Sequence, residues 1–248
     1  MAFPNASTTG VPTGTILTPH SGDMQIDTDG AIIENMDISG VAIIDADNVT
    51  LRNCRVRSTD TFVVVWVHGA NARIEYCDIA GIIHAGGQKA IWIDGAIGCT
   101  VFRCDLSNCD DGLYISGSKH VIRANYIHDM ASGGNDPHFD GVQLEGGDTH
   151  NVTIINNNIV MAIEQNSAIT MGVVQNVLVR GNRLYGGGYT TYCDARFGEG
   201  VMSKVSFVNN RYGTHNYGYT AFEECPPGVP VFTGNVDDIT GAPISAGQ

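Results

Sequence analysis

A short motif recurs nine times along the chain and restricts its fold more than any other feature. It comprises an apolar residue, two variable residues, a key residue that is Met, Cys or Asn, one variable residue and, in all but the last copy, a second apolar residue. The key position is occupied in turn by Met36, Cys54, Cys77, Cys104, Asn125, Asn157, Asn182, Asn210 and Asn235. The spacing varies around an average of about 25 residues, as expected of coils of one size that carry loop insertions.

These repeats predict an all-β solenoid. Each repeat contains short alternating runs of β-type residues that are broken by Gly, Asn or Asp, and no stretch of about ten residues has the 3.6-residue period of an amphipathic helix. Thirty-one Gly and only 16% charged residues also argue against an all-α protein. Stacked coils of this length form a parallel β-helix, in which neighbouring coils share one continuous core. We expect about nine coils over residues 26–240, an N-terminal segment over 1–25 and a C-terminal tail over 241–248.

The key position predicts two internal ladders. Equivalent residues of successive coils lie about 4.8 Å apart, the spacing of paired strands. We therefore expect Cys54, Cys77 and Cys104 to stack as a thiol ladder at an inner turn. The later Asn residues, from Asn125 to Asn235, would form an amide ladder that bonds the next coil and the turn backbone. A redox or metal role for the cysteines is the alternative.

Charge and composition exclude several classes of function. The chain has 26 acidic and 13 basic residues and a formal charge of −13, which argues against a nucleic-acid partner or an anionic membrane surface. No apolar run reaches the ~18 residues of a membrane span, and the first residues lack the features of a secretory signal. Seven cysteines without a C-x-x-C pair favour buried thiols over a disulfide scaffold or a zinc site.

A second recurring run ends at Gly and predicts an exposed groove. Its outward positions would align Trp66, Trp92, Tyr114 and Gln143 in one stripe, and His68, Asp94, Ser116 and Glu145 in a second. Exposed aromatic rings in a row beside carboxylates suit a sugar, which offers C–H faces and a rim of hydroxyls. The alternative is that loops cover these rings, which would then belong to the core.

Acidic residues cluster around the longest insertion, between Ile127 and Gly146. Asp136, His138 and Asp140 alternate and would share one face of an extended segment, and Asp111 is the equivalent of Asp140 one coil earlier. Two carboxylates about 5 Å apart raise one pKa and supply an acid and a base together. His138 adds a base for neutral pH. The alternative is that these aspartates only form turns.

The coils, best seen in Asn151 to Ile159 with the pattern N-V-T-I-x-x-N-x-I, resemble the pectate-lyase-like superfamily. That resemblance covers roughly residues 25–240 and implies a single-stranded right-handed parallel β-helix. Residues 3–15 also resemble the start of β-helix proteins of some bacteria and their phages. This second resemblance implies a cap on the first coil, where an open solenoid edge invites aggregation.

Two motifs resemble those of enzymes with this fold. Asp136-Pro137-His138 is similar to the D-P-H motif of mannuronan epimerases and related alginate lyases, which also implies a tyrosine acid, here Tyr114 or Tyr126, and an arginine, for which Arg123 is the candidate. Asp110 and Asp111 resemble the paired aspartates of polygalacturonase-like hydrolases, but that family's G-H-G and R-I-K motifs are absent.

Three weaker expectations complete the site. Calcium is a third interpretation of the aspartates, because Asp110, Asp111, Asp136 and Asp140 offer hard oxygens, although no required cofactor is expected and no EF-hand loop occurs. His84 and Gln88 lie near a Gly-rich loop beside the groove. Asp194, Arg196 and Glu199 follow a later coil and extend its acidic floor.

The function expected from the sequence is recognition and cleavage of a polysaccharide, by a lyase or a glycoside hydrolase. Trp66, Trp92, Tyr114, Gln143, Glu145 and His84 would bind substrate; Asp111, Asp140 and His138 would provide acid and base, with Asp136 orienting His138. We expect a virion or extracellular location, and the resemblance implies a homotrimer or virion partners. The alternative is a non-catalytic structural protein or adhesin of a virion or cell surface.

Overall fold

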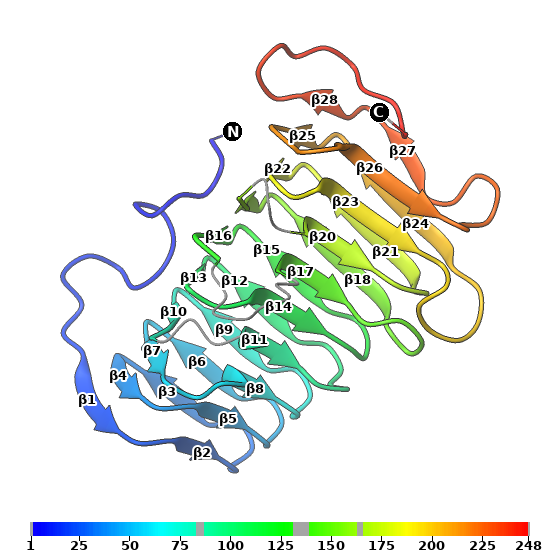
Figure 1. Cartoon of the computed structure of the whole chain (residues 1–248). Coiled ribbons are helices and arrows are strands. Elements are labelled where there is room, and N and C mark those ends of the chain that lie inside the picture. The colour runs from blue at the N-terminus through cyan, green and yellow to red at the C-terminus, as the bar shows by residue number, and fades with distance from the viewer. Residues whose placement is uncertain (1, 83–86, 131–138, 163–165, 248) are drawn as a thin grey trace.

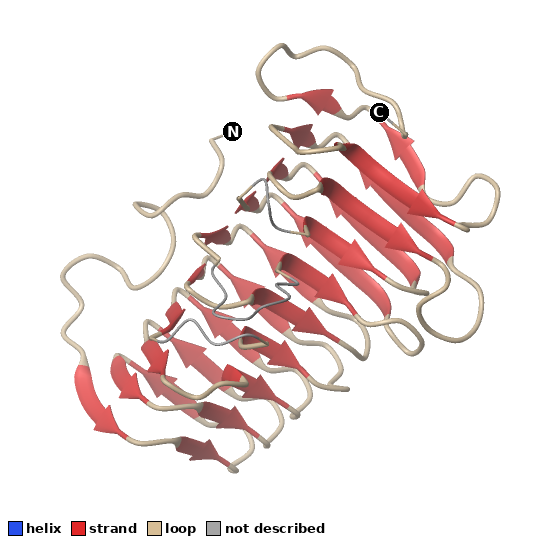
Figure 2. Cartoon of the chain, in the orientation of Figure 1, coloured by secondary structure: helices blue, strands red, loops and turns tan. Residues whose placement is uncertain are grey.

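The chain folds into a parallel β-helix, as Figure 1 shows in a computed structural model. The structure describes residues 2–82, 87–130, 139–162 and 166–247. Every regular element in these ranges is a β-strand (Figure 2), and none of the described residues forms a helix that could cross a membrane. The strands lie in three sheets of ten, nine and nine strands over the described part of the chain, and neighbours in each sheet come from successive coils.

In sheet A, every strand after the first begins at the key residue of its coil or at the residue that follows it. Its strands, in spatial order, are β1 (Thr18–Ser21), β4 (Met36–Ser39), β7 (Arg55–Ser58), β10 (Asp78–Gly81), β13 (Asp105–Ser107), β16 (Tyr126–His128), β19 (Asn158–Val160), β22 (Arg183–Tyr185), β25 (Arg211–Tyr212) and β28 (Val236–Asp237).

Sheet B contains the runs that end at or near Gly and carries the outward stripe. Its strands are β2 (Met24–Ile26), β5 (Ala42–Ile44), β8 (Val63–Val67), β11 (Lys89–Ile93), β14 (Asp111–Ile115), β17 (Asp140–Leu144), β20 (Ser167–Met171), β23 (Tyr189–Asp194) and β26 (Gly218–Glu223).

Sheet C completes each coil. Its strands are β3 (Ile32–Glu34), β6 (Thr50–Arg52), β9 (Arg73–Glu75), β12 (Thr100–Phe102), β15 (Val121–Arg123), β18 (His150–Ile155), β21 (Gln175–Arg180), β24 (Ser203–Val208) and β27 (Val231–Thr233). Inward residues of the three sheets form one hydrophobic core along the solenoid, including Leu51, Ile91, Leu113 and Ile154.

The predicted ladders lie at the turn between sheets C and A. Cys54, Cys77 and Cys104 are buried, and the thiols of Cys77 and Cys104 each point to a carbonyl oxygen of the preceding coil at 3.5 Å. Asn157 Nδ2 donates to Ile122 O and to Asn182 Oδ1, both at 3.0 Å. Both ladders are therefore confirmed, and the same bonding pattern continues to Asn235.

The residue before each key position adopts a left-handed conformation. Its φ lies between 52° and 66° from Asn53 through Gly234, and the occupants include Tyr76, Arg103 and Ala124. L-residues other than Gly and Asn rarely adopt this conformation. One such residue per coil turns the chain from sheet C into sheet A and aims the following side chain into the core.

The N-terminal segment lies along the middle of sheet A, beside coils far from it in sequence (Figure 1). Asn158 Nδ2 donates to Pro4 O at 2.9 Å, and Val11 N donates to Asp78 Oδ1 at 3.0 Å. Gly10 is required there, because a Cβ would lie 1.9 Å from Asp78 Oδ1. Residues 18–26 supply the first strands of sheets A and B, so the described part of segment 1–25 begins the solenoid and straps sheet A instead of covering its first coil.

Candidate functional site

The outward stripe of sheet B has the register expected from the sequence. Trp66 pairs with Trp92, Trp92 with Tyr114, and Tyr114 with Gln143. The pairing continues through Thr170 to Tyr192. Residues distant in sequence thus become neighbours on one face of the solenoid.

The two tryptophans pack on each other. Their rings are stacked with centroids 5.2 Å apart and planes 9° apart, and Phe62 meets both rings edge-on, at 5.7 and 4.9 Å. The Lys89 ammonium lies 5.7 Å from the Trp92 centroid. Neither tryptophan lines the cleft described next, so this half of the predicted binding stripe is a packed aromatic cluster.

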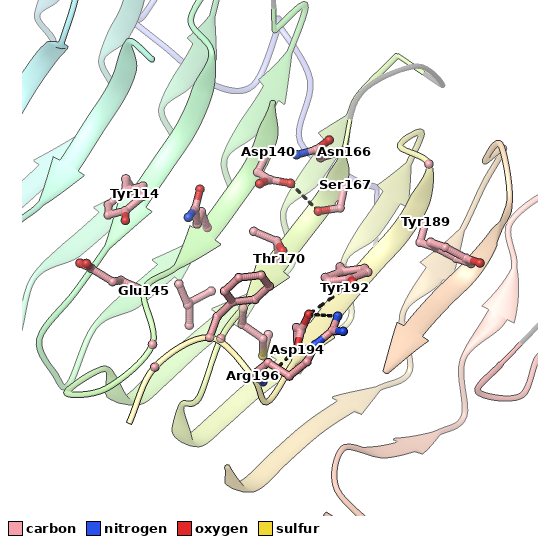
Figure 3. Close-up of a pocket in the computed structure, with 18 of the residues that line it drawn as sticks. Tyr114, Asp140, Glu145, Asn166, Ser167, Thr170, Tyr189, Tyr192, Asp194 and Arg196 are labelled. Carbon is pink, nitrogen blue, oxygen red and sulfur yellow. Dashed lines mark hydrogen bonds and ion pairs between the residues drawn. The ribbon is translucent and has the colours of Figure 1, made fainter. Parts of the chain in front are cut away.

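A cleft of about 970 Å³ lies on the second half of the stripe, over β14, β17, β20 and β23 (Figure 3). Tyr114, Gln143, Thr170 and Tyr192 belong to its floor, and Glu145 lies at its edge. The remaining lining residues are Asp140, Leu144, Gly146, Asn166, Ser167, Met171, Gly172, Gly188, Tyr189, Asp194, Arg196, Phe197, Gly198, Asn216 and Tyr217.

One wall of the cleft depends on two glycines. The loop carrying Phe197 passes so close to β17 and β20 that a Cβ on Gly146 or Gly172 would lie 2.2 or 2.3 Å from Phe197 O. Val173 N donates to the same oxygen at 2.6 Å. Gly146 and Gly172 therefore leave room for this loop, which brings the largely exposed Phe197 ring to the cleft.

A buried carboxyl group lies at one end of the cleft. Asp140 begins β17 and is only 3% exposed. The Ser167 hydroxyl donates to Asp140 Oδ1 at 2.5 Å (Figure 3), and Asp140 N donates to Asp111 Oδ1 at 3.0 Å. Burial, and then the charge of Asp140, raise the pKa of Asp111 well above its usual range. Asp111 is not among the residues that line the cleft, and its carboxyl contacts the backbone of Asp140, which does line it.

A second polar group lies at the opposite side of the floor. Arg196 Nε and Nη2 donate to the two oxygens of Asp194, at 2.8 and 2.6 Å. The Tyr192 hydroxyl donates to Asp194 Oδ2 at 3.4 Å. The hydrogen bonds from Arg196 lower the pKa of Asp194, which is buried and carries its charge at neutral pH.

Of the residues implied by the resemblance to lyases, one tyrosine lies in the cleft and the other candidates lie on different sheets. Tyr114 lines the cleft, and burial followed by the charge of Glu145 raises its pKa to about 12, so it retains its proton. Tyr126 lies on sheet A, stacked on His128 with centroids 4.0 Å apart. Arg123 lies on sheet C over the Phe102 ring, at 4.4 Å. Neither Tyr126 nor Arg123 belongs to the cleft.

Several predicted residues lie outside the described residues or away from the cleft. His84, Asp136 and His138 fall in undescribed segments. Asp110 is buried and accepts a hydrogen bond from Gly87 N at 2.7 Å. Gln88 is also buried. Within the described ranges no group of three or more His, Cys, Asp or Glu could hold a metal ion, and calcium binding that involves Asp136 stays a prediction.

Sequence reasoning missed part of the cleft. Ser167 follows directly from the register, because it pairs with Asp140. Tyr192 lies on β23, which does not end at Gly, so the pattern of runs that end at Gly does not include it. Tyr189, Asn216 and Tyr217 come from later coils, and no repeated motif marks them.

Comparison with known proteins identifies the family. The profile described as "Right handed beta helix region" matches residues 63–225, and the chain belongs to this family. Its solenoid is therefore a right-handed parallel β-helix, as expected. No curated protein matches the chain. Among solved structures, the A-module of mannuronan C-5 epimerase AlgE6 of Azotobacter vinelandii is similar, with 13% identity and a TM-score of 0.37 over 94% of this chain and 91% of that one.

Proposed function

We propose that the cleft binds a polysaccharide and that Asp140 transfers a proton when the glycan is cleaved. The observation that carries this proposal is the position of the Asp140 carboxyl, buried at one end of a cleft with an aromatic and polar floor. A cleft of about 970 Å³ is at the upper end of the range of small-ligand sites. It is open along a solenoid flank, which suits a section of a chain-like ligand.

The lining has the chemistry of a sugar site. Tyr114 and Tyr192 offer flat ring faces to the C–H faces of sugar rings. Gln143, Thr170 and Asn166 offer amides and a hydroxyl that can exchange hydrogen bonds with sugar hydroxyls. These side chains are held at strand spacing, which orients successive sugar units along the stripe.

Asp140 has the surroundings of a general acid or base. Its neighbour Asp111 has a raised pKa, caused mainly by burial and then by the Asp140 charge. Asp111 therefore keeps its proton at a pH where an ordinary aspartate is ionised, beside the Asp140 carboxyl. The Ser167 hydroxyl fixes the Asp140 carboxyl against rotation, which aims one oxygen at the cleft.

The test is turnover on a panel of bacterial polysaccharides. New reducing ends measure cleavage, and absorbance in the unsaturated-uronate band distinguishes a lyase from a hydrolase. We expect Asp140→Asn to lose at least about a hundredfold in rate, the scale of acid–base catalysis, while its circular dichroism spectrum shows that the β-helix is retained. The control is Asp148→Asn, which removes an exposed carboxylate outside the cleft lining. Equal turnover in Asp140→Asn and wild type would refute the assigned role.

A non-catalytic structural protein or adhesin is the second candidate, because the same carboxyls also join coils. Asp111 accepts a backbone N–H of the next coil, and Asp140 accepts a hydroxyl of the coil after that. A structural protein would show no turnover on any member of the panel. A virion or extracellular location, and a homotrimer or virion partners, are further parts of our proposal; size measurement in solution tests the trimer.

A further inference from the structure

The basic residues of this chain are almost absent from the face that carries the cleft. All 13 Lys and Arg residues lie in the described ranges, so each of them can be placed on the fold. Nine lie on strands of sheets A and C, and Arg103 and Lys119 lie in turns. Only Lys89, in β11, and Arg196, two residues after the end of β23, belong to the sheet B side.

The lining of the cleft has an excess of negative charge. Asp140, Glu145 and Asp194 contribute carboxyls, and Arg196 is the one Lys or Arg among the described lining residues. With the carboxyls ionised, the lining charge is −2, on a chain whose formal charge is −13. A cleft lined by one sign of charge repels ligands of that sign, because its low-dielectric walls concentrate the field.

The Arg196 guanidinium already pairs with the Asp194 carboxylate. Both of its hydrogen bonds to Asp194 are short, at 2.8 and 2.6 Å, and form a bidentate pair. Asp194 is fully buried. A ligand carboxylate that drew Arg196 away would leave the Asp194 carboxylate buried without its cation, which is strongly unfavourable.

Lys89 lies outside the cleft lining, and its ammonium contacts a backbone carbonyl and aromatic rings. Its ammonium donates to Gly87 O at 2.8 Å and lies over the Phe62 and Tyr114 rings, at 4.8 and 5.4 Å from their centroids. These contacts hold it among the aromatic cluster at the N-terminal side of Tyr114. No other Lys or Arg lies on the sheet B side to meet an anionic sugar.

We infer that the sugar units bound in this cleft carry no carboxylate or sulfate. This inference rests on the proposed function and specifies its substrate class as an uncharged glycan. The tyrosines, Gln143 and Thr170 match the ring faces and hydroxyls of such a sugar, and no ligand charge has to be compensated.

An uncharged substrate also determines which cleavage reaction is possible. Elimination removes the C5 proton of a uronate, which its carboxylate makes acidic, and an uncharged sugar lacks that group. Cleavage then proceeds by hydrolysis: the glycosidic C–O bond breaks, the hydroxyl of water joins the anomeric carbon, and the remaining proton of water balances the leaving oxygen. The product has a new reducing end and no new C=C bond.

The experiment compares matched polymers on the full-length chain. Polygalacturonate, alginate and hyaluronate are each tested beside their carboxyl-reduced, uncharged products and beside neutral galactans, glucans and mannans. Binding is measured calorimetrically and cleavage by reducing ends, once with EGTA and once with millimolar Ca²⁺. We expect the uncharged polymers to bind with an affinity at least tenfold above that of any uronate form, and the same preference with Ca²⁺.

A charge variant provides the second measurement. Glu145→Gln removes one negative charge at the exposed edge of the cleft and should raise the residual binding of uronate polymers about two- to fivefold at low salt. Glu224→Gln removes the same charge outside the lining and should not. A uronate polymer bound as tightly as its reduced product, with or without Ca²⁺, overturns the substrate class and leaves the proposed function standing. Binding to no polymer overturns both.

Discussion

The Asp111 carboxyl accepts the backbone N–H of Asp140 at 3.0 Å, although 29 residues separate them in sequence. The two residues occupy the same position in neighbouring coils, at the start of β14 and β17. One buried carboxyl thus fixes the backbone that carries the other. Ionising Asp111 lowers the free energy of unfolding, because this carboxyl is removed from water and faces a second acid.

That cost predicts how stability depends on pH. The pKa of Asp111 is raised in the folded protein, by burial first and by Asp140 second. Between the unfolded pKa, about 4, and the higher folded pKa, the folded state binds more protons, so the free energy of unfolding falls as pH rises. Asp111→Asn removes this loss while its amide oxygen still accepts the Asp140 N–H. We expect the variant to melt at least ~2 °C above wild type at pH 8.

At pH 4 the wild-type Asp111 is protonated, and the two proteins should melt at similar temperatures. Thermal melts from pH 4 to pH 9, followed by circular dichroism, provide the comparison. Asp148→Asn, at an exposed position, controls for the change in net charge. A variant that is less stable than wild type by the same amount at both pH values would contradict this account.

The amide ladder predicts a large cost for a single buried truncation. Asn157 Oδ1 accepts hydrogen bonds from Asn125 N and Asn125 Nδ2, and Asn157 Nδ2 donates to Ile122 O. Asn157→Ala leaves these buried groups unpaired, at about 1–3 kcal/mol each. We expect the free energy of unfolding to fall by about 3 kcal/mol or more in chemical denaturation.

Asn5→Ala is the matched substitution outside the ladder. Asn5 is exposed and its side chain bonds only locally, to Ser7, so its loss should cost under about 1 kcal/mol. Similar costs for the two variants would mean that the ladder does not contribute to stability beyond an ordinary surface turn.

Two aromatic variants distinguish the cleft from the aromatic cluster. Tyr192→Ala removes a ring from the cleft floor and should weaken glycan binding about tenfold, a loss of ~1.4 kcal/mol. Trp66→Ala removes a ring that stacks on Trp92 outside the cleft. It should lower the melting temperature and leave glycan affinity within about twofold. Calorimetric titration with the glycan measures the affinity of both variants, and Tyr192→Phe is the control that retains the ring. A larger loss of affinity in Trp66→Ala than in Tyr192→Ala would mean that the glycan binds at the tryptophans.

The fold was predictable because its signal repeats. A constant motif around Cys54, Asn125 and their equivalents specifies an inward residue in every coil, and strand spacing then places those residues in ladders. The left-handed residue before each key position was not predictable as a rule from this chain, because Tyr76, Arg103 and Ala124 occupy it as well as Asn and Gly. The turn requires a backbone conformation, which surrounding contacts enforce on unfavourable residues.

The site was predictable only in register. Alternation placed Trp92, Tyr114 and Gln143 on one face correctly, since strand geometry dictates which side chains point outward. The sequence did not reveal that Phe62 would pack against the tryptophans. It also did not reveal that the loop after Asp194 would pass close to β17 and β20 and form one wall of the cleft. Both depend on loop paths, which have no repeating pattern. The cleft consequently lies further along the stripe than the tryptophans suggested.

The N-terminal strap changes how the solenoid can come apart. Coils in a repeat protein contact only their neighbours, so such arrays tend to fray or melt in segments. Here Asn158 on β19 and Asp78 on β10 are both tied to the segment between Pro4 and Val11, and β13 and β16 lie between those strands. Separating these middle coils from one another requires releasing the strap, which couples them into one cooperative unit. The coils of β13 and β16 continue into β14 and β17, where the cleft begins.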